Sequence, residues 1–466
     1  MKTRIESDSI GSMMVPAEAY YGVQSLRAKQ NFHITSKTLH PLLIVSLAEI
    51  KKAAALTNRK YNNLNKDISH AIILACDEII HGKLHDQFIV DPIQGGAGTS
   101  ANMNINEVVA NRAIEILGGE KGNYDIVNPN DHVNMCQSTN DVFPTAGKIT
   151  AIKMIHQVIL QLERLYNALI AKSFAFENIL KMGRTQLQDA VPVRLGQCFN
   201  AYATMVSRDI DRLIKSLDEM KTVNLGATAI GTSINAPLSY VKNIVPTLKT
   251  VVNLDLKQAR DLIDATQNID CFVAVSGILK TCVVNLSKMC NDLRLLSSGP
   301  KTGIGEINLP AKQNGSSIMP GKINPVIPEV VSQVAFNVIG NDLTITMAAE
   351  AGQLELNAFE PILFYNLFES LETLSHAIST LVDNCIIGIT ANEDHCLELL
   401  EESVGIATAL CPYIGYKKSA EIAKSSLKTG IPIRKLVLKN SILTKEKLDS
   451  ILNPATMTNP KYISAS

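Results

Sequence analysis

The chain has no excess of charge of either sign. Its 466 residues include 44 Lys and Arg and 44 Asp and Glu, so the formal net charge is zero. Nucleic acid and other polyanions require clustered positive charge, and this balance argues against such a partner. Charged residues make up only 19% of the chain and hydrophobic residues 46%. We therefore expect part of the surface to be buried between subunits.

Paired cysteines and metal-binding motifs are also missing. The nine cysteines are scattered singly, with no CxxC pair. We expect no disulfide framework, and a reducing cytoplasmic location fits. The sequence contains no His-Glu-x-x-His motif and no Cys/His cluster with the spacing of metal ligands. We therefore expect neither a metal nor an organic cofactor.

Long apolar runs are absent as well. The first ten residues hold no apolar run suited to a signal peptide. No uninterrupted apolar stretch reaches the thickness of a bilayer. We expect a soluble protein with no membrane partner.

Apolar residues do recur at helical spacing, in five long stretches. These stretches span residues 149–179, 195–223, 259–296, 328–357 and 361–389. Short islands rich in Gly and Pro separate them, which is typical of an up-and-down bundle. Residues 330–339 are apolar on more than one face. A helix of that kind must be buried, here by neighbouring chains.

We therefore predict a mainly α protein with an elongated central bundle of five long helices between two smaller domains. A mixed, mainly helical N-terminal domain is expected at residues 1–140, the bundle at residues 141–392 and a small helical C-terminal domain at residues 393–466. The irregular stretch 297–325 lies within the bundle region. Loops of that length inside a compact body are usually functional.

Four polar islands interrupt the helices. They cover residues 94–104, 136–141, 183–189 and 315–325. Their side chains are mainly hydroxyls and amides, with few charges. Each carboxylate oxygen accepts several hydrogen bonds from such groups. Together the islands predict a site for a small dicarboxylate.

Each island also has a purely structural interpretation. The loop 315–325 resembles a phosphate-binding loop, but five residues separate Gly315 from Gly321, and Ile323 follows Lys322 where a hydroxyl should stand. Its lysine could carry pyridoxal phosphate, although nothing nearby specifies that. The loop could also be an ordinary surface loop.

The other islands have similar alternatives. Residues 138–140 would serve as a helix N-cap, residues 95–98 as a turn, and Arg184 with Asp189 as a structural pair. His132, the histidine nearest the second island, is better read as structural than as catalytic. Four islands in this order nevertheless favour one shared site.

The four islands match, in order, the conserved regions of the aspartase/fumarase superfamily, which the chain resembles over nearly its whole length. These enzymes break a C–N or C–O bond by β-elimination and release fumarate or a fumaryl product. Gln186 stands where class II fumarases carry His, so residues 183–190 resemble the aspartase branch. Cys198 is a departure, because Leu-Gly-Gln is commonly followed there by Glu. We expect that change to affect packing only.

The resemblance implies a role for each island residue. Ser316 is expected to be the general base that removes the proton from C3 of aspartate. Asn140 is expected to hold the amino-bearing end, with Gln186 close to it. The residues expected to bind the two carboxylates are Thr99, Ser138, Thr139, Thr185, Ser317, Lys322 and Asn324.

The implied chemistry explains the need for many neutral donors. Removing a proton beside a carboxylate places a second negative charge on that group, giving a dianionic aci-carboxylate. Fixed donors stabilise this species better than water, which must reorganise. Serine is a poor base unless its oxyanion is stabilised, and Lys322 with nearby backbone N–H groups would do so.

The expected reaction is the reversible deamination of L-aspartate to fumarate and ammonia. Two alternatives are a fumarate hydratase acting on malate and a non-catalytic structural member of the superfamily. The resemblance also implies a homotetramer with active sites shared between subunits. Residues 99 and 138–140 would come from one chain, residues 185–186 from a second and residues 316–324 from a third.

Overall fold

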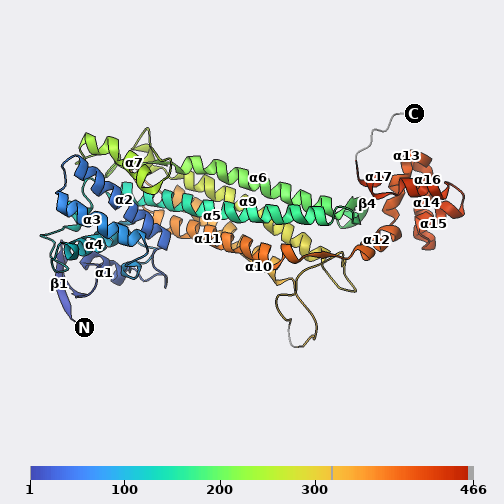
Figure 1. Ribbon diagram of the computed structural model, residues 1–466, viewed down its shortest axis with the longest axis horizontal. Helices are drawn as coiled ribbons and strands as arrows, with labels where there is room; N and C mark the ends of the chain where they lie inside the picture. The colour runs from blue at the N-terminus through green and yellow to red at the C-terminus, as the bar shows by residue number, and fades with distance from the viewer. Residues whose placement is uncertain (1, 316–317, 460–466) are drawn as a thin grey trace. The chain divides into compact units, whose positions relative to one another are not determined.

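A computed structural model describes residues 2–315 and 318–459 of the chain. These residues form two compact units. The first contains Met1–Ile159, Asp211–Thr281 and Phe336–Ser375, and the second contains Leu160–Ile210, Cys282–Ala335 and His376–Ser466. The residue ranges divide each of five long helices between the two units. These helices are labelled in Figure 1. They are α5 (Thr139–Ala175), α6 (Leu195–Met220), α9 (Asp270–Leu296), α10 (Val326–Glu350) and α11 (Glu360–Asn384).

The predicted mainly α fold with five long helices is confirmed, although several of the boundaries were wrong. The fourth helix ends at Glu350 and not near residue 357. The third helix begins at Asp270 and not near residue 259, because β6 (Lys257–Gln258) and α8 (Asp264–Gln267) precede it. The first begins at Thr139 and not near residue 149. It runs through Pro144, which lacks the N–H that would bond to the carbonyl oxygen of Asn140. The Asn224 side-chain amide donates to that oxygen instead, at 3.0 Å.

In the first unit, shorter elements accompany the bundle segments. A β-hairpin of β1 and β2 opens the chain, with Thr3 paired to Pro16. Helices α2 and α3 pack against each other, as do α3 and α4. The bounds are β1 (Thr3–Asp8), β2 (Gly11–Pro16), α1 (Val23–Asn31), α2 (Pro41–Lys60), α3 (Lys66–Ile80), η1 (His85–Gln87), α4 (Thr99–Ile116), η2 (Pro129–Val133), β5 (Thr222–Val223) and α7 (Leu238–Val252).

An aromatic cluster joins three bundle helices within the first unit. The ring of Phe364 on α11 lies 5.1 Å from that of Phe143 on α5 and 5.0 Å from that of Phe272 on α9, measured between centroids. All three side chains are buried. Gly147 packs directly on Phe364, since a Cβ there would come within 2.1 Å of the ring. Close aromatic contacts of this kind hold the helices in register.

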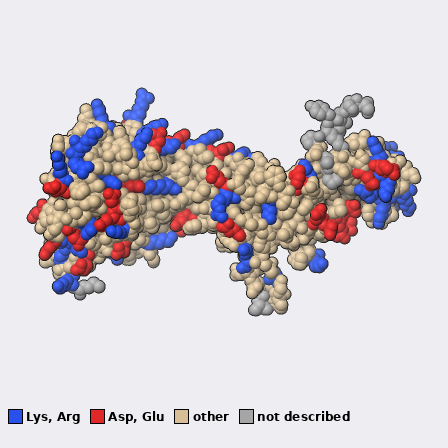
Figure 2. Space-filling model, viewed as in Figure 1, with Lys and Arg blue, Asp and Glu red and all other residues tan. Residues whose placement is uncertain are grey.

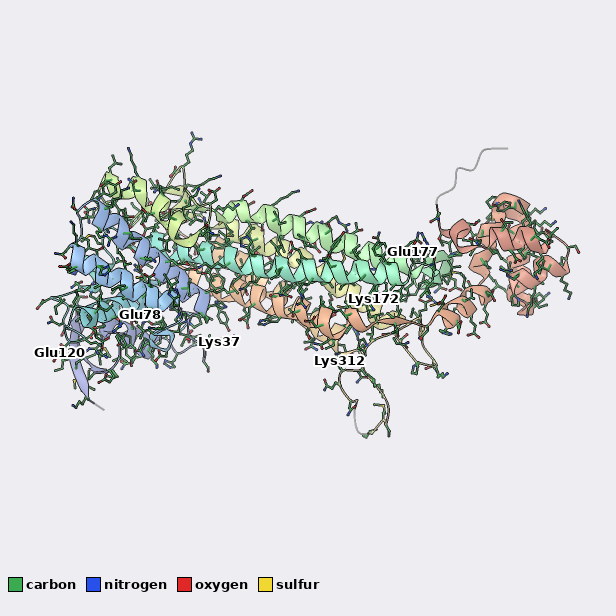
Figure 3. All side chains as sticks on the ribbon, viewed as in Figure 1. Lys37, Glu78, Glu120, Lys172, Glu177 and Lys312 are labelled. Carbon is green, nitrogen blue, oxygen red and sulfur yellow. The ribbon has the colours of Figure 1, made fainter. Side chains whose placement is uncertain are left out.

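In the second unit, the bundle segments are joined by polar contacts as well as apolar ones. Asn285 on α9 donates to Asp209 on α6 at 3.0 Å, and Arg164 on α5 bonds to Asp383 on α11 at 2.6 Å. Near the end of α5, Lys172 (labelled in Figure 3) donates to the carbonyl oxygen of Ile389 at 2.8 Å.

The remaining elements of the second unit are two small antiparallel strand pairs and a group of short helices. The apolar side chains of Leu410, Val437 and Leu448 form the centre of this group and are fully buried. The bounds are β3 (Leu180–Thr185), β4 (Gln188–Arg194), β7 (Ile307–Asn308), η3 (Ile386–Gly388), β8 (Thr390–Ala391), α12 (Glu393–Glu402), η4 (Val404–Leu410), α13 (Cys411–Ile414), α14 (Tyr416–Thr429), α15 (Ile433–Lys439), α16 (Lys445–Ile451) and α17 (Pro454–Thr458).

Helix α9 is the one helix in the described residues that is long and apolar enough to cross a bilayer, judged by length and composition. Leu279, Leu286 and Leu293, which recur at helical spacing along it, are buried in the protein. Packing within the chain therefore accounts for this apolar stripe. On the face shown in Figure 2, acidic and basic side chains are interspersed over much of the surface.

Candidate active site

The first two polar islands meet at the N-termini of two helices. Thr99 is the first residue of α4, and Thr139 is the first residue of α5. The two helices are joined there, because the Asn102 side-chain amide donates to the Thr139 hydroxyl oxygen at 3.1 Å. A helix N-terminus carries unpaired N–H groups and a partial positive charge. This end of the first unit therefore favours an anion such as a carboxylate.

Gly98 allows this close approach of the two helices. Its φ of 86° is in the left-handed region, and a Cβ there would come within 2.4 Å of the Phe143 ring on α5. Any larger residue would be strained and would push α5 away. The glycine-rich first island thus sets the distance between Thr99 and the start of α5.

The hydroxyls of Ser138 and Thr139 are directed by their neighbours. The Ser138 hydroxyl oxygen accepts the backbone N–H of Asn140 at 3.2 Å, and the Thr139 hydroxyl oxygen accepts from Asn102. A hydroxyl has one hydrogen and two acceptor sites. With an acceptor site of each already used, both hydrogens remain available to donate. Two such donors side by side suit the oxygens of a carboxylate.

The Asn140 side chain presents an acceptor, whereas the two hydroxyls present donors. Its side-chain NH₂ donates to the carbonyl oxygen of Ala229 at 2.7 Å. This leaves its amide oxygen with no hydrogen-bond donor among the described residues. An amide oxygen accepts from a cation, so this oxygen suits the ammonium group of an amino acid. Residues 138–140 therefore offer donors and an acceptor within one turn.

Asp141 fixes this turn to a neighbouring loop. Its carboxylate accepts the backbone N–H groups of Ser138 at 2.9 Å, Gly226 at 3.0 Å and Thr228 at 3.1 Å. The side chain is fully buried. Burial raises the pKa of Asp141 to about 6, against the opposing effect of the three backbone hydrogen bonds. Sequence reasoning gave no role to Asp141 or to the loop 224–229, and only the Gly226 turn signalled that loop.

The third island forms the tip of the β3–β4 hairpin. Thr185 and Gln188 pair across the ladder, so Gln186 and Leu187 are the two turn residues. Their φ angles are 53° and 63°, the left-handed values that a two-residue hairpin turn requires. Non-glycine residues pay about 1–3 kcal/mol for such a conformation. Thr185 and Gln186 are exposed.

A buried ion-pair network anchors this hairpin. Glu306, which is fully buried, contacts Arg184 at 2.6 Å and Lys181 at 3.0 Å. Asp189 lies opposite Arg184 in the ladder but accepts from Ser403 at 2.7 Å. Arg184 thus has a structural role, although its partner is Glu306 and not Asp189.

The fourth island is a loop closed at its neck. The backbone N–H of Gly315 donates to the carbonyl oxygen of Lys322 at 3.1 Å, and Asn314 pairs with Ile323. Lys322 is exposed and Asn324 half-buried. Figure 3 labels Lys312, which precedes this neck on the same loop. The predicted base Ser316 and its neighbour Ser317 lie outside the described residues.

The predicted site residues thus fall into two groups. Thr99, Ser138, Thr139 and Asn140 belong to the first unit, where the structure brings residues of the two islands together. The described residues of the second group, Thr185, Gln186, Lys322 and Asn324, belong to the second unit. The catalytic and binding roles of both groups stay predictions.

Two other residues noted in the sequence have structural surroundings. The His132 Nδ1 accepts the backbone N–H of Asn128 at 2.9 Å, within the turn that η2 forms. Cys198 is half-buried, and burial raises the pKa of its thiol. In the described part of the chain, no group of three or more His, Cys, Asp and Glu side chains could hold a metal ion.

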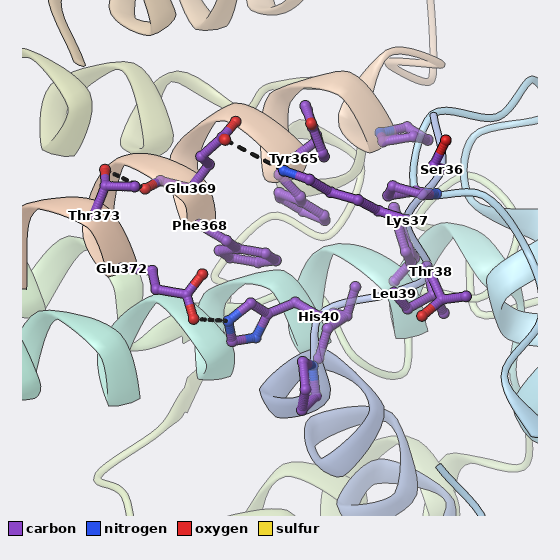
Figure 4. Close-up of a pocket in the computed structure, with 16 residues that line it drawn as sticks. Ser36, Lys37, Thr38, Leu39, His40, Tyr365, Phe368, Glu369, Glu372 and Thr373 are labelled. Atoms are coloured by element: carbon purple, nitrogen blue, oxygen red, sulfur yellow. Dashed lines mark hydrogen bonds and ion pairs between the residues drawn. The ribbon is translucent and has the colours of Figure 1, made fainter. Parts of the chain in front are cut away.

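A cavity of about 670 Å³ lies elsewhere in the first unit, beside α11 (Figure 4). Phe364, Phe368 and other apolar side chains line it. At its rim Lys37 pairs with Glu369 at 3.3 Å and His40 with Glu372 at 3.8 Å. None of the predicted site residues lines this cavity. The candidate active site is therefore the polar turn at the start of α5 and not the cavity.

Known families and proteins match most of the chain. A family model described as lyase matches residues 11–340, and one described as the fumarase C C-terminus matches residues 406–459. The chain is 51% identical over 457 residues to an aspartate ammonia-lyase from Bacillus sp, a match that covers 98% of each protein. The chain therefore belongs to the lyase family of the aspartase/fumarase superfamily.

Two solved structures share the fold. The crystal structure of a fumarate lyase:delta crystallin from Brucella melitensis bound to cobalt has 49% identity and a TM-score of 0.96, covering 98% of this chain and 100% of that one. A recombinant class II fumarase from Schistosoma mansoni has 35% identity and a TM-score of 0.92, covering 98% and 99%. The aspartate ammonia-lyase relative is thus clearly more similar in sequence than this fumarase.

Proposed function

We propose that this protein is an aspartate ammonia-lyase, which converts L-aspartate reversibly to fumarate and ammonia. The observation that carries the proposal is the direction of the hydrogen bonds at residues 138–140. Two hydroxyl hydrogens and one amide oxygen remain available in one turn. That pattern complements a carboxylate beside an ammonium group. The identity with curated aspartate ammonia-lyases supports the same reaction.

The proposed reaction begins with removal of the C3 proton of aspartate by Ser316. The electron pair moves into the adjacent carboxylate and forms the aci-carboxylate dianion. Fixed donors stabilise the added charge, and losing one such donor typically costs about 10²–10³ in rate. The electron pair then returns to form the C2–C3 double bond, and the C–N bond breaks to release ammonia. The donors assigned to the two carboxylates are Thr99, Ser138, Thr139, Thr185, Ser317, Lys322 and Asn324.

Gln186 is the residue assigned to substrate choice. A neutral amide accepts a hydrogen bond from ammonium and cannot become a cation beside it, whereas a histidine can. The left-handed backbone at Gln186 holds it at the tip of the hairpin. We assign to this amide the preference for an amino substrate over malate.

The assembly we propose is a cytoplasmic homotetramer with active sites shared between chains. Helix α5, with 37 residues, separates the second island from the third in the chain. At 1.5 Å per residue it is about 55 Å long, too long for one chain to close the site by itself. Helix α10 also leaves a stripe of apolar side chains exposed. It contains Phe336, Ile339, Leu343 and Met347, exposed by 65%, 39%, 62% and 63%. Such a stripe is suited to burial against other copies.

Absorbance in the fumarate band tests the activity directly. The purified protein is supplied with L-aspartate and, separately, with L-malate. Fumarate formation from aspartate, with little or none from malate, supports the proposal. Comparable efficiencies for both substrates would favour the fumarate hydratase alternative, and no turnover of either would favour the structural one.

Mixing inactive variants tests whether the sites are shared. Thr185→Ala and Ser316→Ala tetramers are dissociated, mixed and reassembled. If different chains supply these residues, some hybrid sites contain no substitution and activity returns. Activity that stays at the inactive baseline despite hybrid tetramers would show that each site is made by one chain.

A further inference from the structure

A buried lysine lies behind the candidate donor turn. Lys51 on α2 has no exposed surface, although lysine is almost never fully buried. Its Nζ donates to the amide oxygen of Asn134 at 2.8 Å and to that of Gln137 at 2.9 Å. Among the described residues, the ion pairs of α2 involve Glu49 and Lys52 and not Lys51, although the Asp141 carboxylate acts on Lys51 from a distance and opposes the fall in its pKa. A buried cation held by two amides is costly, and the reaction described above does not use it.

Lys51 begins a chain of hydrogen bonds that ends at the candidate site. The Asn134 oxygen that accepts from Lys51 also accepts from the Asn102 side-chain amide at 3.2 Å. The same Asn102 amide group donates to the Thr139 hydroxyl oxygen at 3.1 Å. Two side chains, the partly buried Asn134 and the buried Asn102, therefore connect Lys51 to a residue expected to bind a carboxylate.

The direction of this chain follows from the lysine. The Lys51 Nζ donates to both neighbouring amides, so both present their oxygens to it. Asn134 and Gln137 are held in that orientation on their other side, where their NH₂ groups donate to backbone carbonyl oxygens. Because the Asn134 oxygen faces Asn102, Asn102 must present its NH₂ group to both Asn134 and Thr139.

The buried oxygen of Asn102 shows that this orientation has a cost. That atom has no hydrogen-bond donor among the described residues, while the side chain is only 2% exposed. Turning the amide over would let its oxygen accept from the Thr139 hydroxyl. It would also place that oxygen against the Asn134 oxygen. Buried polar atoms without partners are rare, so this one calls for an explanation.

We propose that Lys51 is a positioning residue that orients the Thr139 hydroxyl hydrogen toward the substrate carboxylate. It acts through Asn134 and Asn102 and does not touch the substrate. With Asn102 donating to its oxygen, Thr139 cannot donate to that amide and keeps its hydrogen for the ligand. The inference rests on the proposed function, which assigns Thr139 to a carboxylate.

The affinity for succinate, a dicarboxylate that cannot undergo elimination, measures this orientation without turnover. Isothermal titration of the intact protein compares wild type, Lys51→Met, Thr139→Val and the double variant. A hydrogen bond to a charged group is worth about tenfold or more in affinity. We expect Lys51→Met to raise the Kd for succinate by about tenfold when Thr139 is present. In the Thr139→Val background it should change the Kd by less than about twofold.

Lys52→Met is the matched control. Lys52 is the next residue on α2 and pairs with Asp77 at 2.6 Å, with a quarter of its side chain exposed. It takes no part in the chain to Thr139, so its substitution should leave the Kd for succinate unchanged. A general loss of α2 stability would instead affect both lysine variants.

Two results would overturn the inference: an unchanged Kd in folded Lys51→Met, or equal losses with and without the Thr139 hydroxyl. If Lys51→Met does not fold, Asn102→Leu takes its place, because it interrupts the same chain of hydrogen bonds. Its effect on the Kd for succinate is then compared with and without Thr139→Val, and equal losses in the two backgrounds would overturn the inference. Different results would contradict the proposed function and the role of Lys51. A wild-type protein that neither binds succinate nor deaminates aspartate contradicts the proposed function. An active wild type with uncoupled variants contradicts only the role of Lys51.

Discussion

The Asn224 side-chain amide donates to the backbone carbonyl oxygen of Asn140, 3.0 Å away. This is the carbonyl that Pro144 leaves without a partner inside α5. The same Asn224 amide donates to Thr266 at 3.0 Å, so the loop 224–229 is tied to the first turn of the helix and to α8. One asparagine thus allows a proline-containing helix to begin at the candidate substrate site.

Asn224→Ala should therefore weaken both the fold and the site. The Asn140 carbonyl oxygen would be left unsatisfied, which costs about 1–3 kcal/mol in the free energy of unfolding. We also expect a higher KM for aspartate, because the turn that holds Ser138 and Asn140 would loosen. Chemical denaturation and initial rates measure the two effects. Asn243→Ala is the control, since Asn243 donates only within α7. Equal effects of the two substitutions would contradict this account.

Glu306→Gln should destabilise the third island. The substitution leaves Lys181 and Arg184, whose side chains are 6% and 18% exposed, without their carboxylate. Removing one partner from such a buried network costs about 3–5 kcal/mol. The loss is measured as a fall in the free energy of unfolding together with a fall in activity. At the surface, Glu177→Gln breaks the pair with Arg194 and should cost about 1 kcal/mol or less. A stable, active Glu306→Gln protein would refute the anchoring role.

Lys51 should make the stability depend on pH in a defined window. Burial lowers the pKa of Lys51 from its ordinary 10.5 to about 7, against the opposing effects of Asp141 and Cys76. Below pH 7 the lysine is charged in both states, and the burial penalty is complete. Between pH 7 and 10.5 the unfolded chain keeps a proton that the folded chain has lost, so the folded state gains stability as pH rises.

The difference in melting temperature between wild type and Lys51→Met isolates this effect. We expect the melting temperature of wild type to rise steadily, relative to that of Lys51→Met, from pH 7 to pH 10. Lys52→Met, which lacks a comparable burial, should show no such trend. A constant difference between wild type and Lys51→Met across that window would show that Lys51 does not change its charge there.

Gln186→His should make aspartate turnover more sensitive to acid. An imidazole with a pKa near 6.5 becomes a cation at low pH and then repels the substrate ammonium group. The kcat/KM of the variant relative to wild type should rise as the pH is increased from 5.5 to 8.5. A ratio that does not change with pH would argue against contact between residue 186 and the amino end.

The long helices could be predicted because their apolar residues repeat over many turns. The ends of these helices were harder to predict, and α5 shows why. Pro144 near its start reads as a break in the sequence, and only the distant Asn224 makes the continuous helix possible. Likewise, α9 begins late because residues 257–258 are taken by a pairing with residues 222–223. Local pattern contains no information about such distant partners.

The site, like the fold, was predictable where its residues follow a local pattern and not where distant partners decide. Residues 99 and 138–140 stand in recognisable islands, and the structure brings these islands together. Lys51 gave no signal, because a lysine in an Ala-rich helix reads as solvent-exposed. Asn102 lay inside the first island without an assigned role. Asp141 lay inside an island without an assigned role. Its three backbone partners come from a turn and a loop that only the fold places beside it.

Fumarate formation from L-aspartate by wild type and Ser316→Ala, compared at equal concentrations, tests both the activity and the assignment of its base. We expect steady formation of fumarate with release of ammonia by wild type, and loss of nearly all of it in a variant that keeps its fold and assembly. A Ser316→Ala protein with a tenth or more of wild-type activity would contradict the assignment of the base. A wild-type protein that forms no fumarate from aspartate would contradict the proposed function itself.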